Sequence, residues 1–251
     1  MYNPISFTLA LIRIILIVIL LLIFVPPLLL ADKLFWLSPQ SAFKVRRAWV
    51  KIAKVILGIR VQVNGTPHPE TALYVSNHRS FSDPLIIADY IDAYVIAKAE
   101  VGDLPLISTG AEKTGVIYVQ RDNKESRSSV KKTMVKTLLE GKNVLVFPEG
   151  TTNDKKQLLP YKKGTFFEAA QNGIPVVPII IEYKTQKDLW FQRSIFSHHF
   201  IQFGKLLTDT RLEIGPAFTN SDGEQLRVVI ENWSTATVKR LHKNWGSLFD
   251  N

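Results

Sequence analysis

The chain has 251 residues, enough to bury a full core in one domain, and nothing in its composition requires a second. Its 31 Lys and Arg against 22 Asp and Glu give a formal charge of +9, which favours anionic partners such as nucleic acid, anionic lipid or phosphorylated substrates. Cysteine is absent, which excludes disulfides, thiolate zinc sites and a cysteine nucleophile.

The first predicted element is an apolar helix of membrane-spanning length. Ile5 to Val25 contains one charge, Arg13, and 17 of its 21 residues are Ile, Leu, Val or Phe. As a helix this segment is roughly 31 Å long, close to the ~30 Å hydrocarbon thickness of a bilayer. A cleaved signal peptide is disfavoured, because no charged n-region precedes the apolar run and no A-x-A-like site follows it.

Two prolines and a basic segment follow the apolar run. We expect Pro26 and Pro27 to stop or sharply bend the helix, so residues 1–37 form an anchor that is either a simple span or a re-entrant hairpin. Residues 38–60 mix basic and apolar positions at helical spacing, which predicts an interfacial amphipathic helix. The positive-inside rule places these basic residues, and the main domain predicted over residues 61–251, on the cytoplasmic side.

The main domain is predicted to be α/β, with a mixed central sheet flanked by helices. Short apolar runs rich in β-branched residues predict buried strands at Leu73–Val75, Tyr94–Ala97, Val116–Val119, Val144–Phe147 and Val176–Ile181. Helices are predicted between and after these strands, at Pro84–Tyr90, Ser126–Glu140, Gly164–Gln171 and, as an amphipathic closing helix, Gln225–Trp245.

A histidine and an aspartate stand five residues apart after the first of these strands, in the run Asn77 to Pro84. On one α-helix His78 and Asp83 would point about 140° apart, so the pair must straddle a junction. We expect Asp83 to be the N-cap of a helix that begins at Pro84. His78 then lies in the turn, and a carboxylate on one ring nitrogen makes the other a general base. Taken alone, the spacing also fits an aspartate that merely caps its helix.

Three further sequence motifs favour a catalytic pair over an aspartate that only caps its helix. Phe147 to Thr151 follows a predicted strand, Gly115 to Arg121 precedes a polar loop, and Val176 to Ile179 lies in a strand. With the His78 motif, these blocks resemble in order and spacing the four motifs of the glycerolipid acyltransferase family, over roughly Leu73 to Tyr183. The nearest likeness is to the 1-acyl-sn-glycerol-3-phosphate acyltransferases. The resemblance implies transfer of a fatty acyl group from a thioester to the sn-2 hydroxyl of lysophosphatidic acid.

The resemblance also implies roles for individual residues. His78 corresponds to the family's general base and Asp83 to its orienting partner. Arg121 corresponds to the arginine that binds the acceptor's phosphate, for which a planar guanidinium is well suited. Lys98 stands where family members often carry a lysine that faces the phosphate. Another solvated cation is the alternative for both basic residues.

The block from Phe147 implies further acceptor contacts and contains one departure from the family pattern. Glu149, Gly150 and Thr151 are expected to shape the acceptor site. Thr152-Asn153 stands where arginine followed by serine is usual. One phosphate contact is therefore expected to be missing. Either Lys155, Lys156, Lys162 or Lys163 replaces it, or the acceptor is not lysophosphatidic acid but another lysolipid, such as a lyso-aminolipid or a lysophospholipid with a head group.

The remaining expectations concern partners and rival functions. The resemblance implies no cofactor or metal, because an acyl-CoA or acyl-carrier protein thioester is already activated. The expected partners are membrane lipids, a lysophospholipid acceptor and the acyl donor, at a bacterial inner membrane. Nucleic acid is not expected, since the sequence lacks a zinc finger, an RNA-recognition signature and a glycine-rich phosphate loop. A membrane hydrolase is disfavoured by the lack of a G-x-S-x-G elbow, and a non-catalytic lipid-binding protein by the presence of the histidine and aspartate.

Overall fold

A computed structural model of the chain describes residues 3–98, 105–119, 124–190 and 194–245. Its centre is a seven-stranded mixed sheet in the order β1-β7-β6-β2-β5-β3-β4. The strands are β1 (Ile59–Asn64), β2 (Leu73–Ser76), β3 (Ala93–Lys98), β4 (Val116–Val119), β5 (Asn143–Val146), β6 (Val176–Tyr183) and β7 (Thr208–Ile214). All neighbouring strands are parallel except β6 and β7, so the predicted mixed α/β fold is confirmed.

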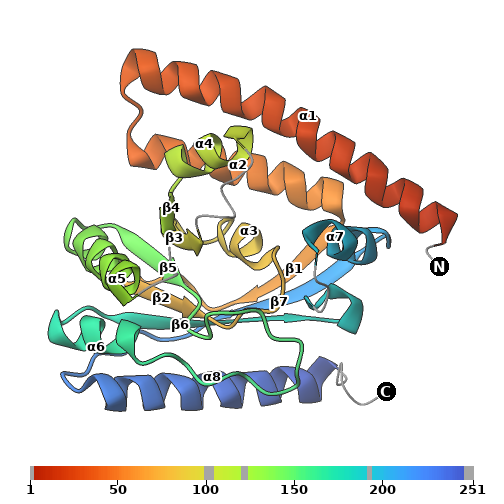
Figure 1. Cartoon of the computed structure of the whole chain (residues 1–251). Coiled ribbons are helices and arrows are strands. Elements are labelled where there is room, and N and C mark those ends of the chain that lie inside the picture. Colours follow the sequence, from red (N-terminus) through yellow and green to blue (C-terminus); the bar gives the residue numbers. More distant parts are fainter. Residues whose placement is uncertain (1–2, 99–104, 120–123, 191–193, 246–251) are drawn as a thin grey trace.

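Helices cover both faces of the sheet (Figure 1). They are α1 (Pro4–Phe35), α2 (Pro39–Leu57), α3 (Asp83–Ile87), α4 (Pro105–Lys113), α5 (Lys124–Leu139), α6 (Gly164–Gln171), α7 (Ile195–Phe203) and α8 (Gly223–Trp245). The chain alternates between two cores, as the period-two geometry of a strand requires. In β2, Tyr74 packs into the cluster with α3 and α7, whereas Leu73 and Val75 pack into the cluster with α5, α6 and α8.

The apolar N-terminal segment forms one long helix. By length and composition α1 could cross a bilayer, since it has 32 residues and an 18-residue stretch within it has a mean hydropathy of 3.3. The expectation that Pro26 and Pro27 stop or sharply bend it was wrong as to the stop, because the helix continues through both to Phe35. α4 packs closely beside the two prolines, since a Cβ on Gly110 would come within 2.8 Å of Val25.

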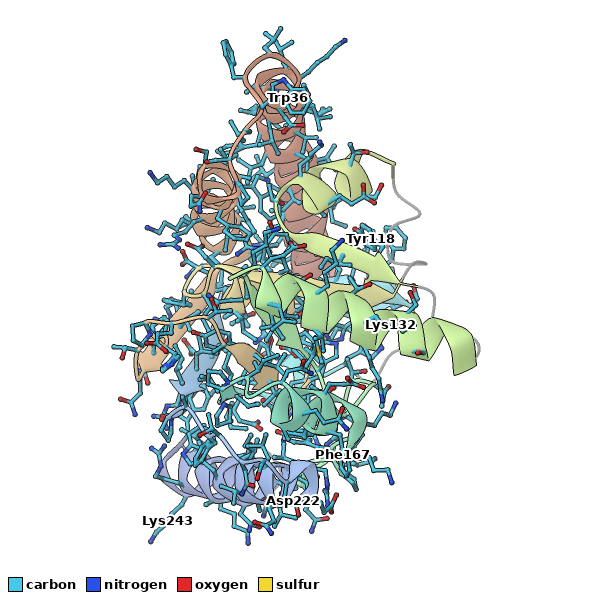
Figure 2. The ribbon with its side chains drawn as sticks, turned by 90° about the vertical axis from the view of Figure 1, so that its left-hand side faces the viewer. Trp36, Tyr118, Lys132, Phe167, Asp222 and Lys243 are labelled. Carbon is cyan, nitrogen blue, oxygen red and sulfur yellow. The ribbon has the colours of Figure 1, made fainter. Side chains whose placement is uncertain are left out.

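α1 and α2 form a hairpin that lies along the domain, with α1 also packed on α4 and α7. Trp36, 91% exposed, marks the tip of the hairpin, at the opposite end of the molecule from Lys243 of α8 (Figure 2). The outer face of α1 carries exposed apolar side chains, including Leu11, Ile15 and Leu22. Such a face is suited to lipid rather than to water.

The charge within the apolar run turns into the protein. Arg13 is buried, and its guanidinium donates hydrogen bonds of 2.6 to 2.9 Å to carbonyls at and beyond the end of α7, those of Phe203, Lys205 and Leu206. Cations bind favourably at the C-terminus of a helix, where carbonyls lack intrahelical partners. The bonds therefore attach α1 to the domain and remove the penalty of exposing this charge to lipid.

Several elements lie where the sequence predicted them, and others were missed. Five strands and the helices α2, α3, α5, α6 and α8 overlap their predicted ranges. The edge strand β1 was missed, because residues 38–60 were assigned to one helix. α2 ends earlier, at Gly58, which adopts a left-handed conformation with φ of 69°. β1 thus crosses the expected boundary between residues 60 and 61, and the division into anchor, interfacial helix and catalytic domain stays a prediction.

Candidate active site

The candidate site lies where β2 ends and the chain turns toward α3. The side chain of Asn77 continues the ladder between β2 and β6: its amide nitrogen donates to the carbonyl of Ile181 at 3.0 Å, and its oxygen accepts from the Ile181 amide at 2.8 Å. Asn77 is fully buried. The start of the loop is therefore fixed to the sheet.

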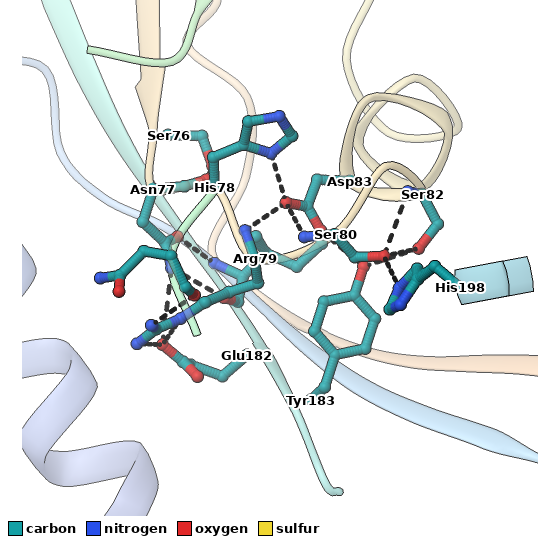
Figure 3. A network of polar contacts seen from close by, with 12 residues as sticks. Ser76, Asn77, His78, Arg79, Ser80, Ser82, Asp83, Glu182, Tyr183 and His198 are labelled. Carbon is teal, nitrogen blue, oxygen red and sulfur yellow. Dashed lines mark hydrogen bonds and ion pairs between the residues drawn. The ribbon is translucent and has the colours of Figure 1, made fainter. Parts of the chain in front are cut away.

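The structure brings His78 and Asp83 together. Nδ1 of His78 lies 2.7 Å from Oδ2 of Asp83, which also accepts from the backbone amides of Arg79 (2.6 Å) and Ser80 (2.8 Å). Asp83 is fully buried and His78 is 20% exposed, with its second ring nitrogen pointing away from the carboxylate (Figure 3). The expectation that Asp83 caps a helix was wrong: α3 begins at Asp83 itself, and its carboxylate turns back into the loop.

A buried ion pair between Arg79 and Glu182 anchors the loop. It lies on the face of the sheet opposite to that of Asp83. Arg79 is fully buried, and its Nε and Nη2 donate to Oε1 of Glu182 at 2.9 and 2.7 Å. Its Nη1 donates to the carbonyls of Asn153 (3.0 Å) and Lys155 (2.5 Å). Arg79 thereby joins the loop, β6 and the segment after β5 (Figure 3). No role was predicted for Arg79 from the sequence, although a glutamate within an apolar strand, Glu182, was a sign of a buried partner.

The segment after β5 forms the second wall of the site. The ring of Phe147 stacks on His78, with centroids 4.2 Å apart and planes at 26°. Gly150 has a φ of 74°, so this turn needs a residue without a Cβ. The carbonyl of His78 accepts from the amide of Asn153 at 2.7 Å, which joins the two segments.

Glu149 is a buried acid beside this pair. It is 4% exposed, and neither carboxylate oxygen has a hydrogen bond of standard geometry among the described residues. Burial raises the pKa of Glu149 to about 7, while the charge of Arg79 and the nearby amides of Leu159 and His78 oppose the rise. With a pKa of about 7, the carboxyl of Glu149 is partly protonated near neutral pH. Its expected role in acceptor binding stays a prediction.

Thr152-Asn153, the departure from the family pattern, has a structural role. Asn153 is 3% exposed. Its side-chain oxygen accepts from the amide of Lys155 at 2.9 Å, and its amide nitrogen donates to the carbonyl of Gln157 at 2.6 Å. Asn153 therefore organises its own loop and is not exposed to a substrate. Thr152 is half-buried and Thr151 is exposed.

One lysine from the later part of this loop lies against the glycine turn. The backbone amide of Lys162 donates to the carbonyl of Pro148 at 2.9 Å, which sets it beside the turn. A Cβ added to Gly150 would lie 2.1 Å from Nζ of Lys162. Of the four lysines that the sequence offered, Lys162 thus has its ammonium group directly over the turn.

Two predicted site residues cannot be placed. Arg121 lies outside the described residues. Lys98 ends β3, but its side chain is outside the described part of the structure. Their expected roles in binding phosphate stay predictions.

An apolar cavity opens beside the loop. Its volume is about 320 Å³, and it lies between the helical hairpin, α3, α4 and the strands β3 and β4. The loop contributes Phe81 to its lining; the other lining residues include Phe24, Val50, Leu85, Val95 and Ala111. The described residues contain no group of three or more His, Cys, Asp or Glu placed to hold a metal ion.

Comparison with known proteins assigns the domain that contains this site. Residues 59–182 match a family model described as Acyltransferase. The chain contains an acyltransferase-family domain. The match begins at β1 and ends at Glu182, so it includes His78, Asp83 and the turn at Gly150.

Named relatives of this acyltransferase domain act on two kinds of acceptor. The chain is 31% identical over 144 residues to a lyso-ornithine lipid O-acyltransferase of Rhizobium meliloti, covering 57% of this chain and 49% of that protein. It is 37% identical over 144 residues to 1-acyl-sn-glycerol-3-phosphate acyltransferase alpha of Mus musculus, covering 55% and 50%. The chain spans about half the length of the curated relatives it matches.

A solved acyltransferase shares the fold over almost the whole chain. The crystal structure of the 1-acyl-sn-glycerophosphate (LPA) acyltransferase PlsC from Thermotoga maritima superposes with a TM-score of 0.74 at 22% identity. The superposition covers 96% of this chain and 97% of that one, so it includes the helical hairpin as well as the sheet.

Proposed function

We propose that the protein transfers a fatty acyl group from an acyl thioester, either acyl-CoA or acyl-carrier protein, to the sn-2 hydroxyl of lysophosphatidic acid. The product is phosphatidic acid. The observation that carries the proposal is the 2.7 Å contact between His78 and Asp83, which orients the imidazole and leaves its Nε2 directed away from the carboxylate.

In the proposed reaction His78 acts as a general base. Its Nε2 takes the proton of the acceptor hydroxyl as the oxygen attacks the thioester carbonyl. The tetrahedral intermediate then collapses, the carbon–sulfur bond breaks, and the departing thiolate receives the proton from the imidazolium. Asp83 accepts a hydrogen bond from Nδ1 and stabilises the imidazolium. The chemistry needs no covalent enzyme intermediate, because the donor is already activated.

Acyl transfer to a defined set of acceptors tests the proposal. The protein would be reconstituted in vesicles with labelled acyl-CoA or acyl-carrier protein and given lysophosphatidic acid, lysophospholipids with head groups, or lyso-ornithine lipid. We expect labelled phosphatidic acid as the main product. Absence of label from every acceptor would refute the function.

Lyso-ornithine lipid is the second candidate acceptor. Two observations favour it: the likeness to the Rhizobium meliloti enzyme, and Thr152-Asn153 in place of arginine and serine. Asn153 stands where the family usually has serine. Its side chain is buried and bonds within its own loop, so it does not replace a serine that would face the acceptor. Preferential labelling of lyso-ornithine lipid in the same assay would establish this alternative and leave the chemistry unchanged.

Lys162 is proposed to supply the cation that the acceptor loop otherwise lacks. Its ammonium group lies over Gly150. We expect Lys162→Ala to raise KM for lysophosphatidic acid about tenfold, the loss of one charge-assisted hydrogen bond, with little change in kcat. Lys163→Ala is the matched control, because Nζ of Lys163 lies 6.0 Å from the ring of Phe167. Equal KM increases in the two variants would contradict the role of Lys162.

The apolar cavity is proposed to hold the acyl chain of the donor. It is lined by small residues on α4 and reaches Phe81 in the loop between the histidine and the aspartate. Ala111→Leu adds three carbons to the lining and is expected to shift the preferred donor to chains shorter by about two carbons, each worth ~0.8 kcal/mol of burial. The control is Ala236→Leu on the exposed side of α8. An unchanged chain-length profile in Ala111→Leu would place the acyl chain elsewhere.

The hairpin of α1 and α2 is proposed to lie in the cytoplasmic leaflet of a membrane. α1 contacts α2, α4 and α7 along its length. These contacts favour a helix that lies in one leaflet while packed on the domain, and disfavour a helix that leaves the domain to cross the bilayer. Basic residues on α2 favour the cytoplasmic side. Protease accessibility in right-side-out and inverted vesicles would decide the side.

A further inference from the structure

The last three residues of β6 hold three residues of the active-site loop. Ile181 pairs with Asn77 and Glu182 with Arg79, as described above. Tyr183 reaches the opposite face of the sheet from Glu182, because successive side chains of a strand alternate. Its hydroxyl donates to Oδ1 of Asp83 at 2.5 Å (Figure 3). Tyr183 lies just beyond the segment that matches the family model.

We propose that Tyr183 is a positioning residue for acyl transfer, which acts on His78 through Asp83. The hydroxyl holds Oδ1, so that Oδ2 is presented to Nδ1 of the imidazole, and it disperses part of the carboxylate's charge. The inference rests on the proposed function, since it assumes that His78 is the base. It adds a third group to the pair and names a tyrosine that no sequence motif indicates.

The surroundings of the hydroxyl favour a role in bonding over one in packing. Tyr183 and Asp83 are both fully buried, and the tyrosine ring belongs to an apolar cluster in which phenylalanine would pack equally well. A hydroxyl buried in such a place is unfavourable unless it forms hydrogen bonds. This one forms two contacts, to Asp83 and, at 2.9 Å, to Oγ of Ser82.

The phenol acts as a donor throughout the working pH range. Burial, followed by the negative charge of Asp83, raises the pKa of Tyr183 well above its usual value. Asp188, which also faces the phenol, is itself paired with Lys205 at 2.6 Å. From α7, His198 adds no charge near neutral pH, since burial lowers its pKa to about 4.

Other titrating or charged groups face the pair from neighbouring segments. Burial raises the pKa of Glu149, beyond β5, to about 7, and this group is expected to affect the pH profile of every variant in the same way. Arg79 and Glu182 neutralise each other on the opposite face of the sheet. We therefore compare the shift of the kcat–pH profile between variants, because the contribution of Glu149 is the same in each and cancels.

Tyr183→Phe tests the proposal through kinetics as a function of pH. Without the hydroxyl of Tyr183, the carboxylate of Asp83 is stabilised by one hydrogen bond fewer. The full negative charge of the carboxylate then stabilises the protonated form of His78 more strongly. Both effects move the acid limb of the kcat profile to higher pH, by about one pH unit. We also expect kcat on the plateau to fall by about tenfold, with KM within about twofold of the native value.

Two further variants separate positioning from packing. Tyr74→Phe removes the hydroxyl of another fully buried tyrosine, on β2, which accepts a hydrogen bond from the amide of His68, and it should leave the acid limb in place. Incorporation of 3,5-difluorotyrosine at position 183 keeps the ring and strengthens the donor, so the acid limb should move to lower pH. This substitution carries the test even if Tyr183→Phe folds poorly.

The outcomes are distinguishable. An active native protein whose acid limb is unmoved in both position-183 variants, or moves equally in Tyr74→Phe, would overturn the role of Tyr183 and leave the proposed function intact. A native protein that transfers no acyl group would instead overturn the proposed function. Opposite displacements in the phenylalanine and fluorotyrosine variants would establish the relay from phenol to carboxylate to imidazole.

Discussion

His78→Ala is expected to lower the rate of acyl transfer by about 10² to 10⁴, the contribution typical of a general base. The substitution removes the imidazole that would take the proton of the acceptor hydroxyl, and no other described imidazole lies beside Asp83 in hydrogen-bond contact. Binding of the acceptor and the acyl chain should persist, since the lining of the cavity and Lys162 are untouched. The loss should therefore fall on kcat.

The same substitution should leave the fold intact. Asp83 keeps the amides of Arg79 and Ser80 and the hydroxyl of Tyr183 as donors, so its buried carboxylate is not stranded. The lost contact with Phe147 and the lost hydrogen bond together cost about 1 to 2 kcal/mol of folding free energy. Labelled acyl transfer and thermal unfolding, measured on one preparation, separate the two effects.

A histidine elsewhere provides the matched control. His68→Ala removes an imidazole from the connection between β1 and β2 and should leave turnover near the native value. Full turnover in His78→Ala would exclude this residue as the base. Equal losses in the two variants would indicate damage to the fold instead.

The sequence predicted those parts of the fold whose signal is local. β2 to β6 are short, mainly apolar runs, and in β2 and β6 every residue is buried, so these strands read as continuous apolar runs rather than as alternating ones. β7 (Thr208–Ile214) was missed because its first four residues are all polar and the strand includes three charged side chains, so it lacks the apolar run by which the other strands were recognised. Its neighbour β1 supplies a side-chain partner for each of the three, as in the contact between Arg60 and Asp209, and that pairing depends on the tertiary fold.

The candidate site shows the same division. The five-residue spacing, taken together with the three further sequence blocks, predicted that His78 and Asp83 meet, and both residues flank one short loop. The partners that fix this loop come from β6, about 100 residues later, and no local pattern links them to it. Arg13 is similar: the sequence indicated a charge that is costly in lipid, whereas its carbonyl partners beyond α7 required the fold.

Arg79→Met is expected to destabilise the protein by about 3 to 5 kcal/mol, because the fully buried carboxylate of Glu182 would keep only long contacts, to Asn77 at 3.5 Å and His242 at 3.4 Å. Glu182 would lose both hydrogen bonds from the guanidinium, and the carbonyls of Asn153 and Lys155 would lose their shared donor. For a chain of this size each kcal/mol lowers Tm by roughly 2 to 4 °C, so a fall of about 10 °C is expected. Turnover should fall too, since the loop carries His78.

The origin of this loss can be tested by removing the stranded charge. An apolar pair of similar volume is often as stable as a buried ion pair, so Arg79→Met with Glu182→Leu should be more stable than Arg79→Met alone. Arg60→Met is the surface control: it breaks the contact with Asp209, in which the Arg60 side chain is 60% exposed, and should change stability by less than about 1 kcal/mol. Additive losses in the double variant would show that the pair is not coupled. The fall in Tm would then reflect the two stranded carbonyls, and the loop would be held mainly through the segment after β5.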